Sequence, residues 1–460
     1  MSELEKHDNI SSEAMASVDR RQWLRNGSIG IAAVVGSTFM NSCAQAQSGS
    51  AANPSAVRSI RDFGILPTNP PDTNRQLLQE AIEWASLSGA ALFIEPAEDP
   101  YPVADGLILR KNVSLIGVHG PTPRGTRHPK KVQPVGSVFK IESQEKPFIT
   151  VESGTQLRGL QFWYAAQTLS DAGKVIEYPP TVQCAQGQYV AGVTLSNLTC
   201  YGEFIAFDLR SDPRTNSKFC AELLLIEHCY GYPLSGRFVD LDYIYDIPRV
   251  LHCHSNPAIR RTIEGDTHRE VIDSVVARKT FTYSINHTDN AVLMDLFSFG
   301  AFGGVRLGPA TYGQLTSFNL DCVSIGIHKS GDSQFNRNWQ IAQGSIIANT
   351  GPRPEDIHPI VIDGKGHTSL TNVEAFSGQN PAISTPTVDV GGRQLTLSHD
   401  FILVDGEEPL TVALTGCRMA NYYAENPITM KNPNAAVSVC GCFKTRAHDN
   451  RAVPIESGLL

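Results

Sequence analysis

Residues 59–96 read SIRDFGILPTNPPDTNRQLLQEAIEWASLSGAALFIEP, and this stretch decides how the chain is expected to fold. Apolar residues recur at helical spacing from Leu77 to Ala85, and Gly89 follows where a helix C-cap is expected. Short apolar runs of strand size come next, at 91–94, 107–109 and 113–117. The sequence therefore predicts one capping helix followed by many short strands.

The body of the chain continues in the same way. From Val138 onward it consists of short runs rich in β-branched and aromatic residues, separated by glycine turns and without helical periodicity. Their spacing is typical of a solenoid, in which neighbouring coils bury one another's apolar faces. An antiparallel sandwich is the alternative, because short strands alone do not reveal parallel pairing.

The entry segment resembles that of the pectate lyase superfamily. Asp62-Phe63-Gly64, the amphipathic helix and a strand ending at Pro96 before Tyr101 occur in the order found there. Two later segments, 157–164 and 178–182, resemble bacterial pectate-lyase-like proteins. The usual Gly-Asp-Gly-Xaa-Thr-Asp-Asp connection is replaced by residues 66–73, of which only the last part fits. The resemblance implies an all-β fold, a right-handed single-stranded parallel β-helix with an N-terminal capping helix.

The ends of the chain are expected to lie outside this β-helix. Arg20 and Arg21 precede an apolar run, 29–39, whose 11 residues are too few for the ~20 that span a bilayer. This pattern resembles a twin-arginine export signal, with an ordinary signal peptide as the alternative. The predicted parts are an export signal (1–46), a flexible tether (47–57), the β-helix (58–446) and a C-terminal tail (447–460).

The export signal can be processed in two ways. Residues 44–46 read Ala-Gln-Ala, which suits cleavage, whereas Cys43 offers a site for a lipid anchor. We expect a periplasmic or extracellular protein, either soluble or held as a lipoprotein, with no membrane span. The net charge of −8 and the lack of a basic cluster beyond 128–131 argue against nucleic acid as a partner.

The ten cysteines of the chain are expected to be buried thiols rather than disulfides. The reason is that most of them occur within or beside apolar strand-like runs. These are Cys184, Cys200, Cys253, Cys322, Cys417 and Cys440. No Cys or His spacing indicates a zinc site, and no metal site is predicted.

Aspartates recur in the sequence at intervals of about one coil. Aligning 294–300 with 320–326 makes Asp295 and Asp321 stacked outward neighbours, with Asp246 further upstream. Two carboxylates on adjacent coils, about 4.8 Å apart, repel when both are ionised, which raises one pKa and provides an acid and a base. Glycoside hydrolysis needs such a pair. We therefore expect Asp295, Asp321 and Asp246 to be catalytic; the structural alternative is solvated acids, or acids paired with arginine.

Residues 240–257 combine acids, aromatics, an arginine and two histidines, a mixture suited to binding sugars. The histidines could also form a metal pair, but a solvated or hydrogen-bonded pair is the more common arrangement. With two arginines from later coils, the predicted substrate-binding residues are Asp242, Tyr243, Arg249, His252, His254, Arg306 and Arg337.

The motifs of glycoside hydrolase family 28 and of calcium-dependent pectate lyases are missing, so the resemblance specifies fold rather than reaction. We expect a polysaccharide-active protein, in the first place a glycoside hydrolase that uses paired carboxylates and needs no cofactor. The alternatives are a lyase or epimerase acting on a uronate polymer and a non-catalytic glycan-binding β-helix. Elimination would need a base and a neutralising group, either Ca²⁺ or a basic residue such as Arg249, Lys279, Arg306 or Arg337. The oligomeric state is left open.

Overall fold

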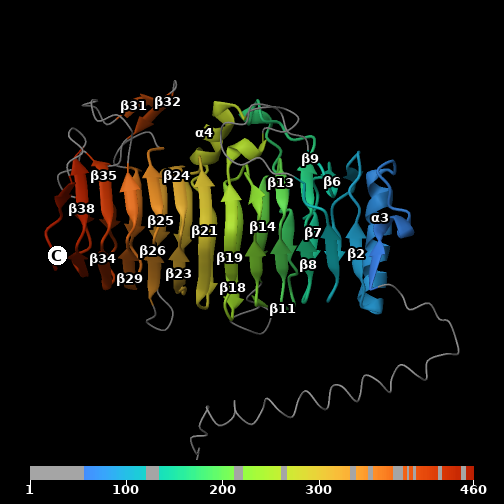
Figure 1. The fold of residues 1–460 in the computed structure, drawn as a ribbon, viewed down its shortest axis with the longest axis horizontal. Helices are drawn as coiled ribbons and strands as arrows, with labels where there is room; N and C mark the ends of the chain where they lie inside the picture. The colour runs from blue at the N-terminus through green and yellow to red at the C-terminus, as the bar shows by residue number, and fades with distance from the viewer. Residues whose placement is uncertain are drawn as a thin grey trace, which may run out of the picture. The chain divides into compact units, whose positions relative to one another are not determined.

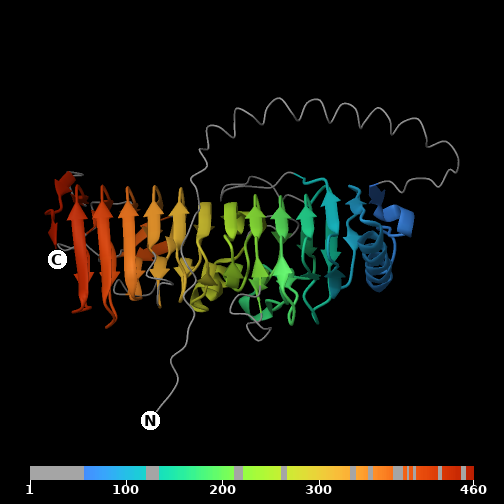
Figure 2. The ribbon, with the colours of Figure 1, turned by 90° about the horizontal axis from the view of Figure 1, so that it is seen from below.

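The computed structural model describes residues 56–120, 134–211, 221–260, 267–331, 338–350, 356–376, 387–390, 393–396, 400–422, 427–446 and 452–459. Residues 55–460 belong to one compact unit. Within it, strands stack in sequence order from the N-terminal helix to the C-terminal end (Figures 1 and 2). The predicted export signal and most of the tether lie outside the described residues.

Most strands belong to a 25-stranded sheet made of two columns, which meet at a bend in each coil. The first column contains β1 (Val57–Ser59), β2 (Ala91–Ile94), β5 (Ser114–Gly117), β8 (Gln156–Arg158), β12 (Thr194–Ser196), β16 (Leu225–Glu227), β19 (Arg249–Ser255), β21 (Ala291–Phe299), β23 (Gly313–Thr316), β26 (Trp339–Ala342), β29 (Gly366–Thr371), β34 (Leu410–Thr415), β37 (Ala435–Cys440) and β40 (Gly458–Leu459). Strands β19 and β21 run through the bend and also contribute to the second column.

The second column contains β3 (Tyr101–Pro102), β6 (Val138–Ile141), β9 (Gln161–Tyr164), β13 (Thr199–Tyr201), β17 (Tyr230–Gly231), β24 (Asn319–Val323), β27 (Ser345–Ala348), β30 (Glu374–Phe376), β35 (Arg418–Tyr422), β38 (Phe443–Arg446) and β39 (Ala452–Pro454). Neighbouring strands pair in parallel until the end of the chain, where β39 and β40 add antiparallel to β38 and β37. Part of the predicted C-terminal tail is thus paired with the sheet.

A 13-stranded parallel sheet forms the third column. Its strands are β4 (Leu107–Leu109), β7 (Ile149–Val151), β10 (Val182–Cys184), β11 (Val190–Ala191), β14 (Ile205–Arg210), β15 (Ala221–Glu222), β18 (Arg237–Tyr245), β20 (Phe281–Thr288), β22 (Gly303–Leu307), β25 (Ile325–Lys329), β28 (His358–Ile362), β33 (Ile402–Val404) and β36 (Ile428–Met430). A separate hairpin joins β31 (Thr387–Val390) to β32 (Arg393–Thr396). Since parallel strands return in the same direction coil after coil, the chain is a right-handed parallel β-helix, as predicted.

The predicted capping helix is confirmed as α3 (Pro71–Ser88), which begins with Pro71 at its first position and ends at Gly89 with φ 68°. A 3₁₀ turn, η1 (Ile60–Phe63), precedes it. The helix buries Leu78, Ala81, Ile82 and Ala85 against the first coil. Because these residues repeat with a period of three to four, one face covers the apolar end of the solenoid.

Three further helical segments lie in loops: η2 (Ala172–Lys174), η3 (Pro257–Arg260) and α4 (Arg269–Ala277). The sequence did not predict α4, whose nine residues bury Val271 and Val275. Its outward residues include Asp273, which pairs with Arg269 at 3.4 Å. No helix among the described residues is long and apolar enough to cross a membrane.

The bend between the two columns of the large sheet is built from residues with left-handed backbone. In successive coils these are Gly159, Asn197, His228, His252, Asp295, Ser317, Gln343, Asn372, Gly416 and Gly441, with φ between 52° and 69°. Small polar residues and glycine tolerate this conformation best, whereas histidine and glutamine adopt it only where the surrounding structure holds them. In the middle coils the bend therefore presents the side chains of residues such as Asp295, Ser317 and Gln343, which are exposed.

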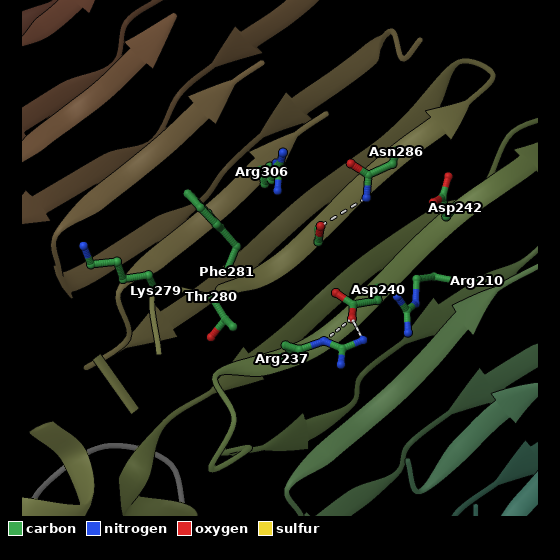
Figure 3. Close-up of a pocket in the computed structure, with 10 residues that line it drawn as sticks. Arg210, Arg237, Asp240, Asp242, Lys279, Thr280, Phe281, Asn286 and Arg306 are labelled. Carbon is green, nitrogen blue, oxygen red and sulfur yellow. Dashed lines mark hydrogen bonds and ion pairs between the residues drawn. The ribbon is translucent and has the colours of Figure 1, made fainter. Parts of the chain in front are cut away.

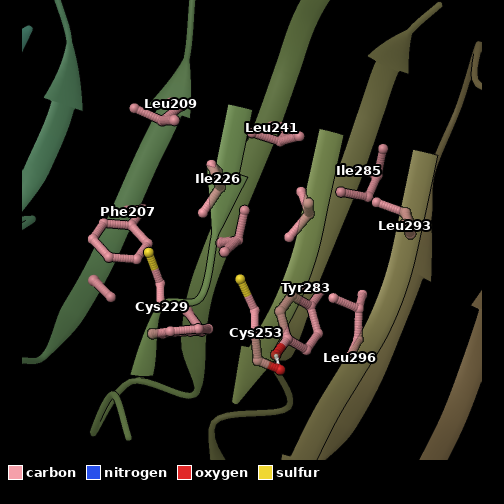
Figure 4. Packing of buried hydrophobic residues seen from close by; sticks show 14 of the residues in the cluster. Phe207, Leu209, Ile226, Cys229, Leu241, Cys253, Tyr283, Ile285, Leu293 and Leu296 are labelled. Atoms are coloured by element: carbon pink, nitrogen blue, oxygen red, sulfur yellow. Dashed lines mark hydrogen bonds between the residues drawn. The ribbon is translucent and has the colours of Figure 1, made fainter. Parts of the chain in front are cut away.

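The residue after each bend points into the core. Strand register gives the column Leu160, Leu198, Cys229, Cys253, Leu296, Phe318, Gly344, Val373, Cys417 and Cys442. Glycine is required at 344 because a Cβ there would lie 2.3 Å from the ring of Phe318. Figure 4 shows Cys229 and Cys253 among packed core side chains that include Phe207, Tyr283 and Leu296.

The eight cysteines in the described segments are free thiols, as expected. Six of them are buried, whereas Cys322 is half-buried and Cys440 is exposed. The expectation of burial is therefore wrong for Cys440, because it precedes the bend on a strand whose alternate residues face outward.

Candidate active site

Polar side chains line the outer face of the 13-stranded sheet over its middle coils. One ladder of register partners runs Asp208, Asp240, Ser284, Arg306 and His328. A second ladder, two residues further along each strand, contains Arg210, Asp242 and Asn286. The residues between the ladders face inward and are buried, among them Leu209, Leu241, Ile285 and Leu307. Strand alternation thus places the polar set on one surface.

This surface is hollowed into a groove of about 270 Å³ (Figure 3). Strands β14, β18, β20 and β22 supply its residues, together with the turn before β20. The lining residues are Arg210, Arg237, Asp240, Asp242, Lys279, Thr280, Phe281, Ser284, Asn286 and Arg306. The groove combines two carboxylates with four basic side chains.

A network of ion pairs forms the acidic side of the groove. Arg210 donates to both oxygens of Asp208, with Nε–Oδ1 2.7 Å and Nη2–Oδ2 2.6 Å. Arg237 bridges two coils, because its Nη2 lies 3.2 Å from Asp208 Oδ2 while its Nε donates to Asp240 Oδ2 at 2.6 Å. Neither described contact of Arg237 uses Oδ1 of Asp240. One carboxylate oxygen is therefore left for a ligand in the groove.

Asp242 has a different partner. Its Oδ1 lies 2.8 Å from Nδ1 of His287, which follows on the adjacent strand β20. Tyr243 stacks on the same imidazole, with ring centroids 4.4 Å apart and planes 2° from parallel. Both Tyr243 and His287 have left-handed backbone, at φ 57° and 39°. A left-handed backbone at a side chain of this size costs conformational energy, and such residues often belong to functional sites.

Both carboxylates hold their protons more tightly than ordinary aspartates. Burial raises the pKa of Asp240, and this effect outweighs the charge of Arg237, which lowers it. Burial also raises the pKa of Asp242, although the hydrogen bond with His287 lowers it. Carboxyl groups with raised pKa values in a groove are candidates for proton transfer.

The opposite side of the groove is basic. Lys279 follows the end of α4 with φ 54°, a turn that leads directly into β20. Arg306 is exposed on β22, and its Nε lies 3.5 Å from Ser330 Oγ. Neither side chain forms an ion pair with a carboxylate in the described part of the chain. Their charges are therefore available to an anionic ligand.

Polar and apolar groups complete the groove. Phe281 is 8% exposed and gives it an apolar patch, while Asn286 Nδ2 donates to Ser284 Oγ at 3.2 Å. Glycine at 308 leaves room for the Asn286 side chain, since a Cβ there would lie 1.8 Å from its Oδ1. Within the described segments, no group of three or more His, Cys, Asp or Glu side chains is arranged to hold a metal ion.

We expect His287→Asn to move the alkaline limb of the activity profile to higher pH. The imidazole lowers the pKa of Asp242, so its removal lets burial raise that pKa further and keeps the carboxyl protonated to higher pH. Asparagine suits the left-handed backbone at this position. The measurement is kcat/KM against pH on a cleaved glycan.

His252→Asn is the matched control for this prediction. His252 also has left-handed backbone, at φ 55°, and its Nδ1 also lies 2.8 Å from an aspartate, Asp295, but on the other sheet. Its profile is expected to match that of the unchanged chain. The same shift in both variants would contradict a specific effect on Asp242.

The linkage of stability to pH has a definite sign for Asp242. Because its folded pKa is raised above the ordinary value of 3.8, the folded state binds the proton more tightly than the unfolded chain. Its contribution to stability is fully present below that ordinary value and is lost as pH rises through the folded pKa.

The predicted pair of Asp295 and Asp321 is wrong in register. Phe299 of β21, not Asp295, is the partner of Asp321, and Asp295 occupies the bend beside Ser317 in the next coil. The alignment failed because the lengths of loops between coils vary, whereas it assumed a constant repeat. Beside these aspartates Leu296 and Leu320 face the core, whereas Met294 and Cys322 are half-buried.

His252 and His254 lie on β19, in the large sheet. His252 contacts exposed Asp295 and stacks on His228 with ring centroids 4.7 Å apart. His254 stacks on Phe297 at 4.3 Å. None of these residues lines the groove on the 13-stranded sheet, so the fold does not bring Asp295 together with Arg306 there.

The remaining predicted site residues divide between the groove and its margin. Asp242 and Arg306 line the groove, whereas Tyr243 stacks on His287, the hydrogen-bond partner of Asp242, outside the groove lining. Asp246 is exposed in the turn after β18, and Arg249 donates to Ile247 O at 3.2 Å at the start of β19. Arg337 lies outside the described residues.

The left-handed turn at Tyr243 interrupts the alternation of side chains along β18. Asp240 and Asp242 share the outward face before the turn. Beyond the turn the pattern reverses, so that Ile244 is buried and Tyr245 is 42% exposed.

Sequence reasoning did not assign the ion-paired residues Asp208, Arg210, Arg237 and Asp240, nor His287. A signal was present: Asp-Leu occurs at Asp208-Leu209 and again at Asp240-Leu241, and these pairs are register partners on adjacent strands. No sequence pattern indicated His287, because its contact with Asp242 depends on the turn at the end of β20.

No protein-family model and no curated protein sequence matches the chain. Solved structures do match. The A-module of the mannuronan C-5 epimerase AlgE6 from Azotobacter vinelandii aligns at 14% identity and TM-score 0.42, covering 87% of this chain and 100% of that one. An exopolygalacturonase from Thermotoga maritima aligns at 11% identity and TM-score 0.44, covering 88% and 96%.

The parallel sheets of the chain form a right-handed β-helix. The resemblance seen in its entry segment is thereby confirmed at the level of fold. A lidless DFA-IIIase from Arthrobacter chlorophenolicus A6, solved with GF2, is also similar, at 8% identity and TM-score 0.47 over 84% of this chain and 94% of that one. A parallel β-helix alone does not specify a reaction, so function has to be argued from the groove.

Proposed function

We propose that the chain is an exported polysaccharide-active enzyme that hydrolyses an acidic glycan in the groove on the 13-stranded sheet. The observation that carries this proposal is the pair Asp240 and Asp242 on one outward face of β18, each with a pKa raised by burial. Hydrolysis of a glycosidic bond requires one carboxyl group as acid and one carboxylate as base or nucleophile.

The two aspartates differ in surroundings, which assigns their roles. Arg237 donates to Asp240 and favours its charged form, so Asp240 acts as the base that removes a proton from water. Asp242 has no described hydrogen bond with an arginine, and it acts as the acid that protonates the leaving oxygen. His287, 2.8 Å from Asp242, returns a proton to it after the bond breaks.

Their spacing favours inversion at the anomeric carbon. Residues two apart on a strand are separated by roughly 6.6 Å, at a rise of about 3.3 Å per residue. Inverting enzymes hold their carboxyl groups about 6.5 to 9.5 Å apart, which leaves room for the attacking water, whereas retaining enzymes need about 5 to 5.5 Å. The product is therefore expected to have the opposite anomeric configuration to the substrate.

Lys279 and Arg306 favour an acidic substrate. Both lie in the groove without a described carboxylate partner, so a sugar carboxylate or sulfate can supply the missing charge. The same residues favour elimination as the second candidate, with Arg306 neutralising a uronate carboxylate and Lys279 removing the adjacent proton.

Incubation of the purified chain with uronate polymers, sulfated glycans and neutral glycans tests the proposal. New reducing ends without ultraviolet absorbance from an unsaturated sugar support hydrolysis. Unsaturated products would show that the reaction is elimination and not hydrolysis. Retention of the polymer without cleavage would replace it by glycan binding, and a preference for neutral glycans would contradict the role given to Lys279 and Arg306.

A further inference from the structure

Two pairs of cysteines occupy neighbouring positions in the core column that follows the bend. The register of the flanking residues places Cys229 beside Cys253 in the middle of the solenoid. It also places Cys417 beside Cys442, because Thr415 pairs with Cys440 and Arg418 pairs with Phe443. Cα atoms of in-register neighbours lie about 4.8 Å apart, which is within the range of about 4.4 to 6.8 Å for disulfides.

The second pair lies in the last two coils. Cys417 connects β34 to β35, and Cys442 connects β37 to β38. Their exposures are 3% and 1%, and both belong to the apolar core. Beyond the last coil lie the antiparallel strands β39 and β40 instead of a further full coil, and terminal units of a solenoid are its least stable parts. A covalent link here would join a terminal coil to the rest of the structure.

The Cys442 thiol donates to Cys440 O at 3.6 Å, and the Cys417 thiol lies 3.5 Å from Leu370 O. The neighbouring Cys417 thiol lowers the pKa of Cys442, whereas the neighbouring Cys442 thiol and burial raise the pKa of Cys417. Cys442 is therefore the sulfur of the pair that loses its proton more easily. A thiolate beside a second thiol is the arrangement that reacts with peroxides.

A small cavity adjoins both sulfurs. It measures about 10 Å³ and is lined by Cys417, Cys442 and apolar side chains that include Phe401, Met419 and Ile455. This is about the volume that one water-sized probe occupies. A disulfide-bearing molecule is far too large for this space, so an oxidant that reaches the sulfurs has to be a small one.

We propose that Cys417 and Cys442 form a modification site at which hydrogen peroxide produces a disulfide between the last two coils. The Cys442 thiolate attacks one oxygen of the peroxide, whose O–O bond breaks, and yields a sulfenic acid and hydroxide. The Cys417 thiol then attacks the sulfur of the sulfenic acid, forms the S–S bond and releases water. One peroxide is reduced for each disulfide formed.

The pair Cys229 and Cys253 provides an internal comparison. It has the same register but lies in the middle of the solenoid, and burial raises the pKa of Cys229. We expect this pair to remain reduced at peroxide concentrations that convert the terminal pair. Disulfide formation in the terminal pair alone would show that it is a reactive site, because both pairs have the same register.

The test uses the full chain with Cys440→Ser, which removes the exposed thiol two residues from the site. The reduced protein is treated with peroxide, unfolded, alkylated and digested with trypsin. A cross-link between peptides 394–418 and 432–444 is expected, with one peroxide consumed per cross-link. Amide hydrogens of β37 and β38 should also exchange more slowly after oxidation.

Two variants assign the roles of the sulfurs. In Cys417→Ala, Cys442 should stop at the sulfenic acid, which dimedone traps; in Cys442→Ala, Cys417 should remain alkylatable. Full alkylation of both thiols after peroxide treatment of the Cys440→Ser chain would overturn the proposal. Cross-linking of Cys229 to Cys253 at the same rate would also overturn it, and neither result depends on the folding of the alanine variants.

Discussion

Asp242→Asn is expected to lower kcat/KM for glycan cleavage by a factor on the order of 10² or more, because it removes the proton that the leaving oxygen needs. Asparagine keeps the size of the side chain, so the free energy of unfolding should barely change. Asp240→Asn is expected to cause a similar loss by removing the base. Measurement of initial rates and of denaturant unfolding for each variant checks both statements.

Asp295→Asn is the matched control. Asp295 accepts a contact from His252 at 2.8 Å, the same distance as between Asp242 and His287, but it lies on the bend of the large sheet. Its activity should remain within a factor of about two of the unchanged chain. Loss of activity in Asp295→Asn together with full activity in Asp242→Asn would move the active site to the bend.

Arg237→Met is expected to lower the free energy of unfolding by about 3 to 5 kcal/mol at neutral pH. Arg237 is the cation between Asp208 and Asp240, whose side chains are only 6% and 7% exposed. Its removal leaves Asp240 buried without an arginine at hydrogen-bond distance, and a buried charge without its partner is strongly destabilising. Denaturant unfolding at neutral and at acid pH measures the loss.

The loss should shrink on acidification, because burial already raises the pKa of Asp240 and protonation removes the charge. Arg210→Met is the control, since the side chain of Arg210 is 50% exposed and its ion pair is partly screened by water. We expect Arg210→Met to lower the free energy of unfolding by about 1 kcal/mol or less. Equal losses in the two variants would show that Arg237 has no special part in holding the carboxylates.

The sequence by itself determined the class of fold. Residues 59–96 contained the helix and its end at Gly89, because capping and periodicity are local properties of the chain, although the helix begins at Pro71, earlier than the apolar spacing from Leu77 indicated. The β-helix followed from apolar runs that are too short to form separate cores and are repeated without a linker. Asp242, Tyr243 and Arg306 were also assigned to a site from their residue types and alternation, and the groove contains or adjoins all three.

Only the tertiary structure decided which carboxylates are neighbours. In a β-helix the loops between strands differ in length, so a count of residues does not give register, and Asp321 is opposite Phe299 rather than Asp295. The left-handed turns at Tyr243 and His287 bring Asp242 to an imidazole that no sequence spacing had indicated. Register depends on hydrogen bonds between strands that are distant in sequence, and for this reason the contacts of the groove and of the cysteine pairs became visible only in the folded chain.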